Sequence, residues 1–79
     1  MFEARTTEEL IRIAVAGGGF EIHVGARTTE DLIRIASASA SNGRGRLFMR
    51  GIGTRATEDL VRIAAAGDGS VVFADPLPD

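Results

Sequence analysis

The chain has 79 residues, of which 44% are hydrophobic and 25% charged, and its formal net charge is −2. A chain of this length forms one small domain, which buries only about 60% of its unfolded surface and so has a marginal core. The absence of cysteine excludes disulfides and thiolate metal sites. No apolar run reaches the roughly 18 residues of a membrane span, and the first residues lack the pattern of a signal peptide. We therefore expect a soluble, cytoplasmic protein.

One eleven-residue phrase occurs three times, at 4–14, 26–36 and 54–64, here called copies 1, 2 and 3. Copies 1 and 2 differ only at Glu9, which is replaced by Asp31. Repetition this close predicts one supersecondary unit that stacks on copies of itself.

Each copy has the pattern of an amphipathic helix. Copy 1 opens with Thr6 and, three residues on, Glu9, which is typical of a capping box, and copy 2 repeats this arrangement. Copy 3 has Ala56 in place of the threonine, so Thr57 is the expected cap there. Glycines at 17 and 67 are expected to end the first and third helices. Each copy also places a glutamate four residues before an arginine, which predicts ion pairs within the helices: Glu8–Arg12, Glu30–Arg34 and Glu58–Arg62.

A run typical of a strand follows each helix, at 20–24, 47–52 and 71–74, and residues 1–4 precede the first helix as a strand would. Aligned on the repeat, Phe2, Val24 and Ile52 occupy equivalent positions. Helical connections between strands imply parallel pairing with right-handed crossovers. We expect an α/β fold: a short, solenoid-like βα repeat with a four-stranded parallel sheet and three helices on one face.

The domain organisation follows from this order. A single domain is expected over 1–75, with repeats at about 1–19, 20–46 and 47–70 and a closing strand at 71–75. Residues 76–79 would form a C-terminal tail.

A one-sided helix layer leaves the other face of the sheet uncovered. The strand at 20–24 places Glu21 and His23 there, which suits contact with water. The later strands are apolar on both faces, and the ends of the stack expose strand edges. A homodimer would cover these surfaces; alternatively, residues 75–79 fold back over them. The expected dimer face consists of Leu47, Met49, Val71 and Phe73.

One segment breaks the repeat. Copies 1 and 2 begin 22 residues apart and copies 2 and 3 begin 28 apart, so copy 2 is followed by 28 − 22 = 6 extra residues. The segment at 37–46, here called the basic insertion, begins with alternating Ser and Ala, expected to extend the helix, and ends in Gly-Arg-Gly-Arg. Residues 32–57 hold five arginines and no acidic residue. Guanidinium groups bind carboxylates and phosphates with two hydrogen bonds. The candidate binding residues are Arg44, Arg46, Arg50 and Arg55.

Four interpretations of these arginines stay open, one of which is the binding of a small anion such as a phosphorylated ligand. In the other three, they bind an acidic protein, they bind nucleic acid, or Arg34 and Arg55 simply repeat positions of the other copies while the insertion is solvated. Nucleic acid is less favoured, because the net charge is negative and neither Tyr nor Trp is present for stacking.

Catalytic signals are sparse. His23 and Glu21 could act as an acid–base pair, most simply if two-fold symmetry brought two pairs together. One histidine and one carboxylate are too few for a metal site. The glycines at 17–19 follow a helix, whereas phosphate-binding loops precede one.

We expect a small non-enzymatic protein interaction module without cofactor or metal. It would be homodimeric and would bind an acidic partner through the basic insertion. The alternatives are a nucleic-acid-binding or regulatory protein that uses the same arginines, and a designed or recently duplicated repeat without an evolved ligand.

Overall fold

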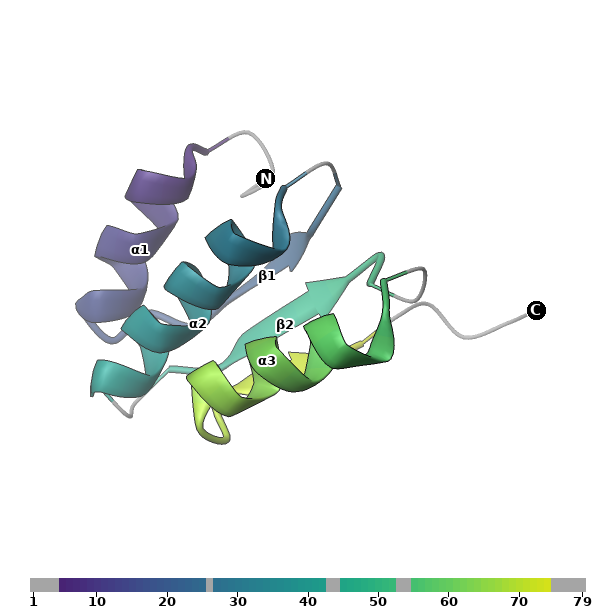
Figure 1. Ribbon diagram of the computed structural model, residues 1–79. Coiled ribbons are helices and arrows are strands. Elements are labelled where there is room, and N and C mark those ends of the chain that lie inside the picture. The colour runs from purple at the N-terminus through teal and green to yellow at the C-terminus, as the bar shows by residue number, and fades with distance from the viewer. Residues whose placement is uncertain (1–4, 26, 43–44, 53–54, 75–79) are drawn as a thin grey trace.

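The computed structural model describes residues 5–25, 27–42, 45–52 and 55–74. Within these residues, helices and strands alternate along the chain, and the three helices lie side by side over one face of the sheet (Figure 1). The elements are α1 (Thr7–Val15), β1 (Phe20–His23), α2 (Thr29–Asn42), β2 (Leu47–Arg50), α3 (Thr57–Gly67) and β3 (Val71–Phe73).

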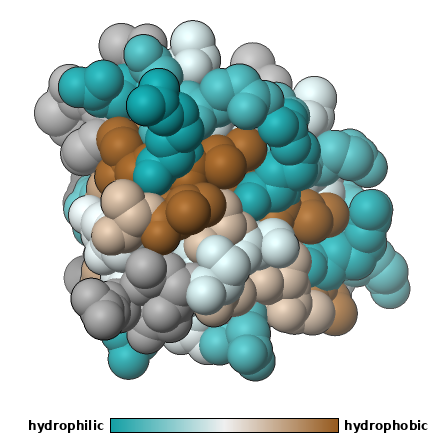
Figure 2. Space-filling model, turned by 90° about the vertical axis from the view of Figure 1, so that its left-hand side faces the viewer, coloured by the Kyte–Doolittle hydropathy of each residue, from teal (hydrophilic) through white to brown (hydrophobic). Residues whose placement is uncertain are grey.

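The sheet has the order β1-β2-β3, and both pairs of strands are parallel. The predictions of an α/β class, parallel pairing and a one-sided helix layer are confirmed. Within the described residues the sheet contains three strands, whereas four were predicted. The expected first strand, 1–4, lies outside the described residues, as does the tail at 75–79. The stack of helices ends on one side at α1, and this side faces the viewer in Figure 2.

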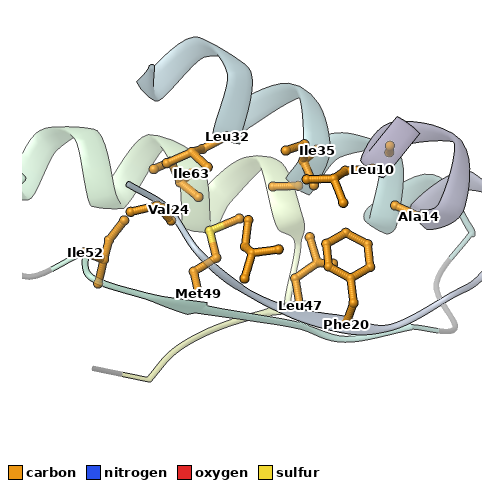
Figure 3. Packing of buried hydrophobic residues seen from close by; sticks show 13 residues of the cluster. Leu10, Ala14, Phe20, Val24, Leu32, Ile35, Leu47, Met49, Ile52 and Ile63 are labelled. Carbon is orange, nitrogen blue, oxygen red and sulfur yellow. The ribbon is translucent and has the colours of Figure 1, made fainter. Parts of the chain in front are cut away.

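The core lies between the helices and the sheet, where side chains from both layers meet (Figure 3). Equivalent residues of different copies contribute to it, as Leu10 and Leu32 do. The bulkiest of its fully buried apolar side chains are Leu10, Ile22, Leu32, Ile35, Leu47, Met49 and Ile63.

The helix starts follow the capping residues. The hydroxyl of Thr6 accepts from Glu9 N–H, and the Glu9 carboxylate accepts from Thr6 N–H, which confirms the capping box. Thr28 Oγ1 accepts from the third amide of α2 at 3.1 Å. The N-cap of α3 is Ala56, which makes no side-chain hydrogen bond, and Thr57 is already the first helical residue. The expectation that Thr57 caps this helix is therefore wrong.

The helix ends differ from one another. Gly17 follows α1 with a φ of 96°, where it was expected to end the helix. Gly67 is still part of α3, and Asp68 takes the left-handed conformation after it, with a φ of 48°.

The spacing between β1 and β2 along the chain is one residue shorter than the spacing between the helices that follow them. β1 and β2 pair residues that are 27 apart, beginning with Phe20 opposite Leu47, whereas the helical copies are 28 apart. Val24 and Ile52, which are 28 apart, are both buried at the strand ends. One surplus residue therefore lies just before Ile52. It is Gly51, whose φ of 75° is a conformation that glycine adopts without strain.

This surplus residue reverses the predicted facing of the later strands. Leu47 and Met49 were expected on the uncovered face, but both are 0% exposed and pack under the helices. Val71 and Phe73 lie opposite them in the sheet and pack against the same core. The predicted placement of all four on an open dimer face is wrong, because a shift of one residue exchanges the two faces of a strand.

Candidate interaction surfaces

The face of the sheet away from the helices is mixed in character. Glu21 and His23 are exposed, and Phe48 lies opposite Glu21 with 38% of its surface exposed. Half-buried Val72 follows Phe48 in the same row across the sheet. The apolar part of this sheet face is thus a narrow strip beside charged residues.

Arg50 belongs to this face and not to the basic insertion. Its Nε donates to Glu21 Oε2 across the pair of strands. Its Nη1 donates to the carbonyl of Ala74 at 2.7 Å. The guanidinium therefore ties the strands together, which separates Arg50 from the other candidate binding residues.

Arg55 takes part in a contact that the protein makes twice, here called the arginine ladder. Arg55 donates from Nη2 to the carbonyl of Arg27 at 2.5 Å and from Nη1 to Thr29 Oγ1 at 3.1 Å. Arg27 donates in the same way to the carbonyl of Arg5 at 2.5 Å and to Thr7 Oγ1 at 2.8 Å. Each arginine thus binds the start of the preceding copy. The interpretation that Arg55 repeats a position of the other copies fits this geometry.

The charged residues of the helices pair between copies. Arg34 Nη2 lies 2.5 Å from Glu8 Oε2 of the preceding helix, and Arg62 Nη2 lies 3.6 Å from Glu30 Oε2. Within their own helices, Arg34 lies 3.6 Å from Asp31 and Arg62 lies 3.8 Å from Asp59, so the partners there are the aspartates and not the predicted Glu30 and Glu58. The hydrogen bond to Glu8 is the largest cause of a pKa of Arg34 above its usual value. All four side chains of the pairs between copies are half or more exposed, so each of these pairs adds little stability by itself.

The basic insertion begins inside α2, which continues to Asn42 as predicted. Arg44 lies outside the described residues. Arg46 is exposed, and no ion pair joins it to another residue in the described ranges. It borders a groove of about 230 Å³ between the end of the insertion and the turn after α3, with Asp68 as the other charged residue of the groove wall.

The pair of His23 and Glu21 is less isolated than the sequence implied. Both are exposed on the open face, but the Glu21 carboxylate accepts from Arg50. The His23 ring packs over Gly51, where a Cβ would collide with it. Among the described residues, no three His, Asp or Glu side chains are grouped so as to hold a metal ion.

Arg50 could be separated from the insertion only with the structure. The partner of Arg50 is 29 residues away in sequence and becomes its neighbour through strand pairing. Arg55 carried a signal in the sequence, since copies 1 and 2 have arginine at the same place.

Within the described part of the chain, none of the helices is both long and apolar enough to cross a membrane. Comparisons with protein-family models, with curated proteins and with solved structures found no match to this chain.

Proposed function

We propose that this chain is a small, non-enzymatic protein interaction module that binds an acidic partner through Arg44 and Arg46 of the basic insertion. The observation that supports the proposal most is the exposure of Arg46. Arg50 and Arg55, by contrast, bind groups of the chain itself. An exposed guanidinium can bind a carboxylate with two parallel hydrogen bonds.

The position of the insertion adds a second argument. Loops that vary on a regular scaffold carry binding residues more often than the scaffold does. The helix and sheet layers continue on both sides of the insertion with the same arginine ladder. The residues added here lengthen α2 to 14 residues, against 9 in α1, while the contacts of the ladder are kept.

The proposal is tested by pull-down from nuclease-treated lysate with the tagged wild-type chain, Arg46→Glu and the double variant R44E/R46E. Arg12→Glu is the matched control, because Arg12 is also exposed and its reversal changes the charge equally. We expect a stoichiometric protein that binds the wild type and Arg12→Glu, binds Arg46→Glu weakly and is lost with the double variant. Equal capture by all four chains would contradict the proposal.

Nuclease separates this proposal from nucleic-acid binding. Material that disappears after nuclease treatment, and whose binding falls steeply with added salt, would indicate that the same arginines bind phosphates. That outcome would replace the acidic protein partner.

A further inference from the structure

The two ends of the helix stack carry opposite halves of the contact that joins its helices. We propose that copies of this chain associate head to tail, with α3 of one copy packed against α1 of the next. This proposal goes beyond the function proposed above and uses different residues.

The internal contact has two sides. The preceding helix offers a glutamate and, three residues later, an aliphatic residue: Glu8 and Ile11 in α1, and Glu30 and Ile33 in α2. The following helix offers an arginine and then an isoleucine, as Arg34 and Ile35 do in α2 and the equivalent residues do in α3. The arginine pairs with the glutamate of the preceding helix, and the isoleucine enters the core.

At the α1 end, the following-helix side of this contact has no preceding helix to bind within the described chain. A groove of about 370 Å³ is lined there by Arg5, Glu9, Arg12, Ile13 and Ala16. Figure 2 looks onto this side and shows hydrophobic side chains gathered among hydrophilic ones.

The exposure of two residues at the α1 end shows what a preceding helix provides in the other copies. Ile13 is only half-buried, whereas its equivalents Ile35 and Ile63 are 0% exposed. Arg12 is exposed and has no ion pair within the described residues, whereas its equivalents Arg34 and Arg62 each pair with the preceding helix.

At the α3 end, the preceding-helix side is open in the same way. Val61 has 60% of its surface exposed, whereas Ile11 and Ile33 at the same place in α1 and α2 are half-buried. Glu58 is exposed, and none of the ion pairs among the described residues includes it. Its equivalents Glu8 and Glu30 each bind an arginine of the following helix.

A second copy supplies what each end lacks. Arg12 of one copy would pair with Glu58 of another, as Arg34 pairs with Glu8, and Ile13 would gain contact with the apolar Val61. The charges are complementary, and the new contact continues a packing that the chain already makes between α1 and α2 and between α2 and α3. Because the two surfaces differ, the association is heterologous and builds rings or open chains rather than closed two-fold dimers.

The test is sedimentation equilibrium of the full chain over a range of concentrations, with wild type, Arg12→Glu, Glu58→Arg and R12E/E58R. The wild-type mass is expected to rise with concentration. Each single reversal should weaken association about fivefold or more, since it removes a pair and brings like charges together. The double variant restores an opposite-charge pair and should associate again. Arg46→Glu is the matched control and should behave as wild type.

Mixing gives the most specific result. Arg12→Glu and Glu58→Arg are each self-repelling. In an equimolar mixture, however, every junction between the two different variants joins opposite charges, so the mixture should associate more strongly than either variant alone. A dimer that forms through the sheet would show no such effect.

Val61→Asp checks the apolar part of the junction. The side chain is exposed in the single chain, so the variant should fold, as circular dichroism can verify, while its association is lost. A wild type that remains monomeric at every attainable concentration would overturn the proposal. So would equal association by wild type, Val61→Asp and Glu58→Arg, or a mixture no more associated than its components. Loss of partner capture by Arg46→Glu with unchanged assembly would leave the two proposals separate.

Discussion

At the residue scale, Ala56 leaves α3 without the side-chain cap that the first two helices have. Thr6 and Thr28 each accept a hydrogen bond from an amide of the first helical turn. The same turn of α3 has no such acceptor at its N-cap, although the backbone of Ala56 has the extended conformation that a capping residue adopts, with φ −63° and ψ 147°. A threonine would fit this backbone without rearrangement.

We predict that Ala56→Thr raises the free energy of unfolding by about 1 kcal/mol, because its hydroxyl would accept from an amide of the first turn that has no side-chain acceptor at the N-cap. Urea denaturation followed by circular dichroism measures the change. Ala65→Thr, at an exposed position inside the same helix, is the control and should lower stability by a few tenths of a kcal/mol, since threonine is a weaker helix former than alanine. An unfolding free energy of Ala56→Thr that is equal to or below that of the unchanged chain would contradict the capping argument.

At the element scale, the arginine ladder joins the beginnings of successive copies. Arg55 reaches both a hydroxyl and a carbonyl of copy 2, and Arg27 makes the same two contacts to copy 1. Lysine carries a single ammonium group on a flexible stem and cannot reproduce the planar fork of a guanidinium.

We predict that Arg55→Lys and Thr29→Val are coupled by about 1 kcal/mol in a double-mutant cycle of unfolding free energies, because the two side chains share a hydrogen bond of 3.1 Å. The equivalent cycle, Arg27→Lys with Thr7→Val, should give a similar coupling, since that hydrogen bond is 2.8 Å long. Additive effects in both cycles would mean that the arginine–threonine hydrogen bonds of the ladder contribute no stability.

Helices and strand order could be predicted from the sequence at this scale, whereas strand facing could not. The repeated phrase has a clear helical period, and parallel order follows from the helical connections. The facing of β2 depended on a single surplus residue. Gly51 and Gly53 flank Ile52 in a short apolar segment, and nothing in that pattern indicates which residue is surplus. The error at Leu47 and Met49 followed directly from this.

The roles of the candidate binding residues were also predictable only in part. Position within the repeat already separated Arg55 from the others, and the structure places it in the ladder. The contact of Arg50 with Glu21 arises from strand pairing between distant segments, which no local pattern indicates.

At the scale of the whole molecule, the contact between copies 1 and 2 is repeated between copies 2 and 3. The helix pairs α1·α2 and α2·α3 use equivalent ion pairs, and the two halves of the ladder use equivalent atoms. In stacked repeats, stability is approximately a sum of unit and nearest-neighbour contributions.

We predict that a chain in which residues 20–46 are duplicated in tandem folds with one more helix and strand, and unfolds at a higher urea concentration than the original. The junction is favourable because Phe20 would follow Arg46 where Leu47 does now, and Phe20 and Leu47 occupy the same row of the sheet. The dependence of unfolding on urea should also steepen, since more surface is exposed on unfolding. An unchanged or lower midpoint would show that the copies are not interchangeable.

The arginine ladder also bears on where the chain can change in length, because it joins the connections at only one end of the strands. It fixes the turns that lead from strands into helices, because each arginine must reach a carbonyl and a hydroxyl of the copy before it. Where helices lead into strands, length has already changed: α2 has 14 residues and α1 has 9, and β1 and β2 remain paired. Loop-closure entropy grows slowly with length. Added residues are therefore accommodated where a helix leads into a strand, whereas the turns from β1 to α2 and from β2 to α3, which the ladder joins, differ in length by the single residue Gly51.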